Sequence, residues 1–182
     1  MKNILTRMLN KLLGIFTSIS DECDNRKTYY KNGQLESETP LVNRKEHGIK
    51  KHYYENGKLW HELPYTKGKR HGIKIGYYKT GQLESETPYV LNKKHGIEKS
   101  YYKNGKLEHE IPYENGKEHG IEKWYYENGQ LIAEIPIVLG KMHGIEKQYN
   151  KSGKLEAERT RVRGEIIGIN NYHENGDIRK QV

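Results

Sequence analysis

The sequence predicts an all-β protein: an elongated meander of about seven 24-residue β-hairpin repeats in one twisted sheet, behind an amphipathic α-helix. Two periodic series of glycines and the residues around them lead to this prediction. One series marks a turn every 24 residues, at Gly33, Gly57, Gly81, Gly105, Gly129 and Gly153, with a shortened last interval to Gly176. The second series keeps the same interval, at Gly48, Gly72, Gly96, Gly120, Gly144 and Gly168. Runs rich in Tyr, Ile and Leu flank each Asn-Gly-type turn, as expected for hairpins.

The composition agrees with a thin repeat structure. Only 33% of the 182 residues are hydrophobic, yet the chain holds 15 tyrosines and a single Phe. Tyrosine has an apolar ring and a polar hydroxyl, so it suits a sheet face that is partly exposed to solvent better than a thick hydrophobic core. The net charge of +8 falls within the repeats, and a basic surface of this kind attracts nucleic acid, anionic lipid or an acidic protein. Cys23 is the only cysteine, so no disulfide within the chain and no cysteine-based metal site is expected.

Residues 1–24 are predicted to form an amphipathic helix and a linker, since apolar residues follow helical spacing up to about Ile19. The apolar stripe includes Leu5, Leu9, Leu12 and Phe16, which we expect to contact the first hairpin and cap it. Two alternatives stay open: a helix on a membrane surface, and an export signal. We expect a cytoplasmic protein, with membrane association or export through this segment as the alternatives.

Residues 25–182 form the predicted array, and the unit from Gly48 onward shows its logic. An extended run up to Tyr54 and another from Lys58 to Tyr65 flank the turn, so each unit is two antiparallel strands. Proline recurs near the end of the second strand, at Pro40, Pro64, Pro88, Pro112 and Pro136. Because proline has no N–H, we expect pairing to stop there.

Simple alternation assigns the side chains to two faces. Ile49, Lys51 and Tyr53 are then expected on a mostly apolar face with Leu59, His61, Leu63 and Tyr65. The other face is expected to be mostly polar and to carry His52, Tyr54 and Trp60. The last unit is irregular: Ile167 stands where other units have His, and its turn is one residue shorter. We interpret it as a capping unit.

The repeated pattern His-Gly-Ile-x-Lys-x-Tyr-Tyr-x-Asn-Gly-x-Leu-x-x-Glu-x-Pro resembles the MORN repeat family, specifically its bacterial second variant. It is clearest from Gly96 to Pro112 and from Gly120 to Pro136. The resemblance implies an elongated array of β-hairpins in one twisted sheet. Bacterial proteins of this variant are commonly described as YwqK-type antitoxins, while other members are linked to protein scaffolding and to anionic lipid. A repeat scaffold does not by itself determine function.

Two side-chain ladders could be mistaken for active sites: His47, His71, His95, His119 and His143, and Glu38, Glu62, Glu86, Glu110, Glu134 and Glu158. Neighbouring ladder members are two strands apart, roughly 9.5 Å, and zinc needs ligands at about 2.1 Å. We therefore expect the histidines to serve the turn and the glutamates to pair with lysines on neighbouring strands. No catalytic, cofactor-binding or metal-binding residue is predicted.

Positions that differ between units are better candidates for binding, because the scaffold does not dictate them. If Tyr53 pairs with Leu59, His52 faces Trp60, and in the fifth unit Trp124 faces Ile132. An exposed tryptophan is a frequent anchor in protein interfaces. The predicted partner-binding residues are Trp60, Trp124, Ile132, His52, Tyr54 and Tyr126. The alternative is that each Trp simply packs on a Tyr of the next strand.

These features favour a non-enzymatic protein that binds another protein and neutralises or occludes it, as an antitoxin, immunity protein or inhibitor would. A toxin, a nuclease or another effector is the expected kind of partner. The alternative is direct binding of the basic array to nucleic acid or to an anionic membrane surface.

Overall fold

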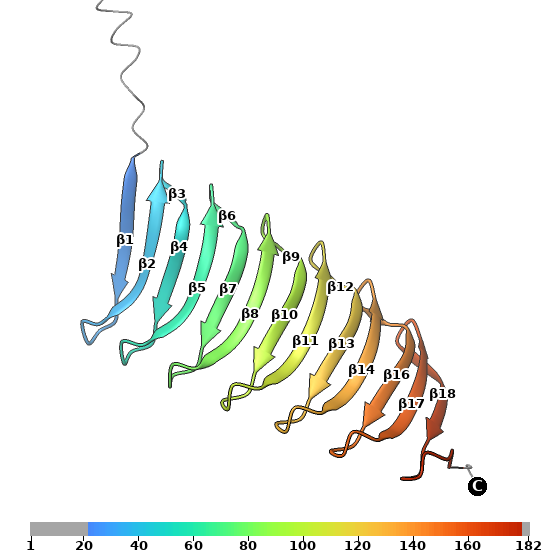
Figure 1. Cartoon of the computed structure of the whole chain (residues 1–182). Helices are drawn as coiled ribbons and strands as arrows, with labels where there is room; N and C mark the ends of the chain where they lie inside the picture. Colours follow the sequence, from blue (N-terminus) through green and yellow to red (C-terminus); the bar gives the residue numbers. More distant parts are fainter. Residues whose placement is uncertain (1–21, 180–182) are drawn as a thin grey trace, which may run out of the picture.

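The computed structural model describes residues 22–179, which form one open antiparallel sheet of 18 strands. Strands follow one another along the sheet in chain order, and Figure 1 shows the hairpins side by side in a long array with β1 at one end and β18 at the other. No described residue is helical. The all-β prediction is confirmed, whereas the amphipathic helix predicted near the N-terminus lies outside the described residues.

The strands fall into a regular series. The first half contains β1 (Cys23–Tyr29), β2 (Leu35–Val42), β3 (Lys45–Glu46), β4 (Gly48–Tyr53), β5 (Leu59–Thr66), β6 (Lys69–Arg70), β7 (Gly72–Tyr77), β8 (Leu83–Val90) and β9 (Lys93–Lys94). The second half contains β10 (Gly96–Tyr101), β11 (Leu107–Glu114), β12 (Lys117–Glu118), β13 (Gly120–Tyr125), β14 (Leu131–Val138), β15 (Lys141–Met142), β16 (Gly144–Tyr149), β17 (Leu155–Val162) and β18 (Glu165–Asn171). The two-residue strands β3, β6, β9, β12 and β15 belong to the links between hairpins.

The Asn-Gly turns close each hairpin as the sequence predicts. In the β4–β5 hairpin, the amide of Tyr54 donates to the carbonyl of Lys58 at 2.8 Å, and the amide of Gly57 donates to the carbonyl of Tyr54 at 2.8 Å. The side-chain oxygen of Asn56 accepts from the amide of Lys58 at 3.1 Å. Gly57 takes φ 80°, a conformation that glycine reaches without steric cost.

The second glycine series has a packing reason as well as a conformational one. Gly72 takes φ 117°, and a Cβ at this position would lie 2.9 Å from Cγ of Pro64. The preceding His71 donates its backbone N–H to the carbonyl of Pro64 at 3.1 Å. Glycine and proline are therefore a matched pair across the link, because the proline ring fills the space that a side chain would need.

Proline limits pairing on one side only. Within the hairpin, Ile49 still pairs with Pro64, and β5 continues to Thr66. Pairing of β5 with the next hairpin is short, from His61↔Gly76 to Glu62↔Ile75. The expectation that pairing stops at proline is therefore correct between hairpins and wrong within them.

Tyrosine hydroxyls join neighbouring hairpins where the backbone pairing is short. Five tyrosines donate to the carbonyl 23 residues ahead at 2.6 to 3.1 Å: Tyr30, Tyr54, Tyr78, Tyr102 and Tyr126. From the second unit on, the tyrosine that precedes this position donates to a glutamate of the preceding hairpin, as Tyr53 does to Glu38 at 2.8 Å and Tyr101 to Glu86 at 2.9 Å.

A β-bulge in every full hairpin corrects the predicted faces. Tyr53 pairs with Leu59, but His52 pairs with His61 and Lys50 with Leu63, so one residue of β5, Trp60, is extra. A bulge of this kind reverses the alternation of all following side chains. His61, Leu63 and Tyr65 therefore share a face with Lys50 and His52, not with Ile49, Lys51 and Tyr53 as simple alternation predicts.

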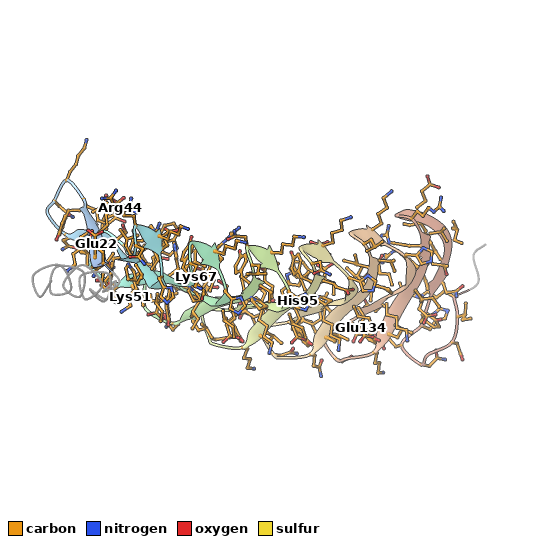
Figure 2. The ribbon with its side chains drawn as sticks, turned by 90° about the horizontal axis from the view of Figure 1, so that it is seen from above. Glu22, Arg44, Lys51, Lys67, His95 and Glu134 are labelled. Atoms are coloured by element: carbon orange, nitrogen blue, oxygen red, sulfur yellow. The ribbon has the colours of Figure 1, made fainter. Side chains whose placement is uncertain are left out.

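We call the face that carries Lys50, His52, His61, Leu63 and Tyr65 and their equivalents the inner face, and the opposite one the outer face. Every buried residue of the described part lies on the inner face: Ser37, Thr39, Leu41, Gly76, Thr87, Ile137, Glu146 and Ala157. Burial is therefore greatest on the inner face, and Figure 1 shows that the strands of the sheet are bent. Figure 2 shows the same array from above, with side chains on both sides of the ribbon.

The last unit departs from the pattern, as expected for an irregular copy. Thr160 replaces the proline and pairs with Gly168, which does not take the positive φ seen at Gly144 (φ 121°). With Ile167 in place of His, the link and the next strand merge into one continuous strand, β18. Its pairing with β17 has a bulge of its own, in which Ile167 is the extra residue between Thr160↔Gly168 and Arg161↔Ile166.

Candidate functional site

The candidate site is the inner face, because the units differ from one another there. Paired positions of β4 and β5 separate cleanly: Ile49 with Pro64 and Lys51 with Glu62 on the outer face, His52 with His61 and Lys50 with Leu63 on the inner face. On the outer face the position of Ile49 is isoleucine in the second to sixth units: Ile49, Ile73, Ile97, Ile121 and Ile145. On the inner face the position of His52 holds a different residue in each unit: His52, Gly76, Ser100, Trp124 and Gln148.

The register corrects two of the predicted contacts. His52 pairs with His61, not with Trp60, and Trp124 pairs with Ala133, not with Ile132. Trp60 and Ile132 both occupy the bulge, which simple alternation does not anticipate. The two tryptophans therefore belong to different positions of the repeat, one in a bulge and one in a strand.

Trp60 belongs to an aromatic cluster at the first end of the array. Its ring centroid lies 4.7 Å from that of His61, 5.8 Å from that of Tyr54 and 6.5 Å from that of His52. The rings of His52 and His61 are stacked at 4.5 Å. Trp60 remains 44% exposed. The cluster therefore presents a rigid aromatic surface and keeps part of it in contact with solvent.

The histidines of this cluster are held neutral. Burial lowers the pKa of His61 to about 4, and Lys74, His52 and Lys50 add to the effect. Burial and Lys50 also lower the pKa of His52. Nδ1 of His61 is buried without a hydrogen-bond partner among the described residues. Since protonation would place a charge on this face beside two lysines, the stacked pair stays uncharged at neutral pH.

Trp124 is fixed by a charged residue that the sequence reasoning missed. Its ring stacks on His109 of the neighbouring hairpin at 3.6 Å between centroids. Its Nε1 donates to Oε1 of Glu122 at 2.8 Å, and Nε2 of His109 lies 2.6 Å from the same oxygen. Trp124 is still 37% exposed. One carboxylate thus holds two aromatic rings in place.

The remaining predicted residues are divided between the face and the scaffold. Ile132 lies in the bulge of β14, next to Ala133. The hydroxyls of Tyr54 and Tyr126 donate to the carbonyls of Tyr77 and Tyr149, so both serve the joints between hairpins. Tyr54 also contacts the ring of Trp60. The predicted helix contacts cannot be placed, because residues 1–21 lie outside the described part.

A cluster of charged residues marks the other end of the inner face. Glu146 is buried and accepts from Nη1 of Arg159 at 3.0 Å and from Nε of Arg161. Nη1 of Arg159 also donates to Gln148 at 2.9 Å. Arg159 and Arg161 stand where other units have Leu, Ile, Thr or Tyr, and this departure from the repeat was a visible but unused signal in the sequence.

The two ladders have structural partners. The histidine amides bond to the proline carbonyls, and Nδ1 of His47 and His95 accepts from an amide of the following link at 3.4 Å. The regular partner of each ladder glutamate is a tyrosine hydroxyl. Among residues 22–179, lysine lies within ion-pair distance only of Glu38 (3.7 Å, from Lys51) and Glu110 (4.0 Å, from Lys99). No group of three or more potential ligands among the described residues could hold a metal ion.

Comparison with known proteins agrees with this architecture. The model of the MORN repeat variant family matches residues 25–43, 46–67, 70–90, 94–115, 118–138 and 142–162, which is more than half of the chain. The chain therefore belongs to the MORN repeat family. The six matched repeats do not include the last, irregular unit.

Curated proteins and solved structures add little to this. No curated protein matches the chain. A crystal structure of a S. aureus TarM mutant in complex with fondaparinux, alpha-GlcNAc-glycerol and UDP is similar at 13% identity, with a TM-score of 0.29. The match covers 81% of this chain and 24% of that one. Within residues 22–179, no helix has the length and apolar character needed to cross a membrane.

Proposed function

We propose that the chain is a non-enzymatic scaffold that binds a partner protein along its inner face and neutralises or occludes it. The observation that carries this proposal is that the units differ from one another more on the inner face than on the outer face, where Ile75 and Thr160 are among the few departures. The outer face largely repeats the same residues, such as the isoleucines equivalent to Ile49 and the glutamates equivalent to Glu62, whereas the inner face varies at most positions and holds both aromatic clusters. A surface that varies over a constant frame is typical of repeat proteins that bind other proteins.

The mechanism is steric. Trp60 and Trp124 lie two and a half hairpins apart, and at roughly 4.8 Å per strand the inner face between them spans several strand widths. Fixed, partly exposed aromatic rings are frequent anchors of protein interfaces, because they bury large area at low entropic cost. If a partner binds at both clusters, the array covers the part of the partner's surface that lies between the two contacts.

The family and the partner class are part of the same proposal. The resemblance to the bacterial second variant of the MORN repeat supports an antitoxin, immunity protein or inhibitor of the YwqK type. A toxin, a nuclease or another effector is then the partner. Nucleic acid or an anionic membrane is the competing ligand, and the carboxylates of Glu98, Glu122 and Glu146 on the inner face disfavour a continuous polyanion there.

Affinity capture with the full chain as bait tests the proposal. We expect Trp124→Ala to lower recovery of the partner by at least about tenfold, the loss of a typical interface anchor. Lys123→Ala is the matched control, since Lys123 neighbours Trp124 but lies on the outer face, paired with Glu134. The same capture is repeated after nuclease treatment.

Three results would overturn the proposal. Equal recovery with Trp124→Ala and the wild-type chain would exclude the inner face as the binding surface. Loss of all partners after nuclease treatment would show that nucleic acid mediates the capture. Binding that disappears as salt is raised from about 50 to 200 mM would indicate a polyanion as the ligand.

A further inference from the structure

A second feature of the inner face concerns the charges at the links between hairpins. In each link that contains His-Gly, two residues of the inner face lie four positions apart in the chain. One is the residue before His-Gly and the other is the second residue after His-Gly, as Glu46 and Lys50 are. Between the first two units they form the ion pair Lys50–Glu46, with 3.3 Å between Nζ and Oε1. Two links later they form the reversed pair Lys94–Glu98, with 2.6 Å between Nζ and Oε2. The repeat therefore brings these two side chains into contact.

The link between these two carries two cations at the same positions. Arg70 in β6 and Lys74 in β7 replace the acid and base of the neighbouring links. Among residues 22–179, neither has a carboxylate within ion-pair distance: the ion pairs of the structure involve other residues. A frame that forms an ion pair on either side thus holds two like charges here.

The residues around Arg70 and Lys74 favour the binding of an anion. The guanidinium of Arg70 lies over the ring of Tyr89 at 4.6 Å, and its Nη2 donates to the carbonyl of Asn92 at 3.2 Å, so the group is oriented. Lys74 is paired across the hairpin with Thr87, which is only 7% exposed. The corresponding residues of the second, fourth and fifth units are Leu63, Ile111 and Ile135. A threonine thus lies opposite Lys74, at a position that also holds threonine in the first unit (Thr39) and an apolar side chain in these three units.

We propose that Arg70 and Lys74 form an anion-binding site that receives an acidic side chain of the protein partner. A carboxylate there would restore the missing half of the ion pair, with Arg70 able to bind it through two parallel N–H groups. This inference rests on the proposed function, since it names the chemistry of the partner on the same face.

The charges along the inner face favour an isolated acidic side chain over a nucleic acid. From the next unit on, the position of Lys74 is glutamate: Glu98, Glu122 and Glu146. Glu118 lies on the same face, where its Oε1 accepts from the hydroxyl of Tyr113 at 3.3 Å. A phosphate backbone that followed the face from Arg70 would meet these carboxylates. A polypeptide with one acidic residue at the site and neutral or basic residues beyond it would not.

Short random peptides displayed on phage and selected on the full chain at ~0.15 M salt provide the probe. We expect the selected peptides to be enriched in Asp and Glu. Lys74→Glu should lower their affinity at least about tenfold. This substitution recreates beside Arg70 the ion pair seen between Lys94 and Glu98, so the fold is retained. The thermal midpoint at low salt should not fall.

Two further variants distinguish the effect of the site on peptide affinity from the effect of the net charge of the protein. Lys93→Glu changes the net charge by the same amount at an exposed position of β9 paired with Val90, and should leave peptide affinity within about twofold of the wild-type value. Glu98→Lys places a second cation beside Lys94 and should create a further site for the same peptides.

Peptides without acidic enrichment, or equal affinity for the Lys74→Glu variant, would overturn the site while leaving the Trp124 test of the proposed function untouched. Single-stranded RNA is the second arm. RNA that binds at the same salt and is lost in Lys74→Glu would assign the site to phosphates and overturn the protein source. If Trp124→Ala leaves partner capture unchanged but Lys74→Glu still abolishes peptide binding, the proposed function fails and the anion site remains.

Discussion

At the scale of single residues, the two adjacent tyrosines of the second to fifth units each bond to a different neighbouring hairpin. Tyr101 donates its hydroxyl to Glu86 of the preceding hairpin at 2.9 Å, and Tyr102 donates to the backbone carbonyl of Tyr125 ahead at 2.6 Å. Each hairpin is thus tied to both neighbours by side chains. A glutamate that accepts a tyrosine hydroxyl explains why both residues recur in every unit.

The tyrosine–glutamate bond should be measurable in Tyr101→Phe. The substitution leaves the carboxylate of Glu86 without its donor, and we expect a loss of about 1–2 kcal/mol in the free energy of unfolding. Urea denaturation at neutral pH measures it. Tyr29→Phe is the control: Tyr29 is 60% exposed, its hydroxyl has no hydrogen bond in residues 22–179, and its loss should cost almost nothing.

The same bond has a pH dependence. Burial and the bond to Glu86 raise the pKa of Tyr101 to about 12, above its usual 10.0. The folded state therefore binds more protons than the unfolded state between these values, and the contribution is complete below pH 10 and lost as pH rises toward 12. In the Tyr101→Phe variant, the free energy of unfolding should decrease less steeply between pH 10 and about pH 12 than in the wild-type protein.

His61 should make stability depend on mild acid. Its pKa of about 4 lies below the usual 6.5, so the unfolded state binds more protons between these values. Stability should therefore fall as pH decreases from about 6.5 toward 4. The fall should be smaller in His61→Ser, which installs the residue found at the same position of neighbouring units, Ser37 and Ser85. Thermal midpoints across this pH range measure the difference, and parallel curves would contradict the assignment.

At the scale of elements, each hairpin depends on two glycines with different demands. Gly129 in the Asn-Gly turn needs only its positive φ (94°), since a Cβ there would meet nothing within 4 Å. Gly120 after the link needs positive φ (125°) and also space, because a Cβ would lie 2.9 Å from Cγ of Pro112. The link is therefore the less tolerant of the two turns.

Alanine substitutions should separate the two demands. Gly129→Ala should cost about 1–2 kcal/mol, the strain of a left-handed conformation. Gly120→Ala should cost clearly more, because strain and the contact with Pro112 add. Chemical denaturation of both variants gives the comparison. Equal costs would show that the proline ring yields without penalty.

At the scale of the whole molecule, each hairpin touches only its neighbours, so stability is shared along the array and not centred in one core. β1 pairs only with β2 and β18 only with β17 among the described strands, and their residues are almost all exposed. We expect amide hydrogen exchange to be slowest in β10 to β14 and fastest in β1 and β18. Uniform protection would instead indicate a single cooperative unit.

Much of this architecture could be predicted from the sequence, because its signals are local. Asn56-Gly57 fixes a turn through backbone conformation, and the 24-residue period repeats the same unit. The partners of Trp60 and Trp124 could not be predicted, because one bulge residue per hairpin changes which side chains meet. The residues around Trp60 in the sequence do not show whether it lies in a bulge or in a regular strand. Glu122 was missed for the same reason, because its contacts with Trp124 and His109 depend on this pairing.

The sequence by itself determined the repeat, the turns and the family, since each depends on residues close together in the chain. Only the tertiary structure decided which side chains share a face, because the bulge acts on pairing between strands. The register placed most of the constant residues on the outer face and most of the variable ones on the inner face. It also showed Arg70 and Lys74 as two cations between two links that form ion pairs at the same positions, since residues of neighbouring links must be compared in space.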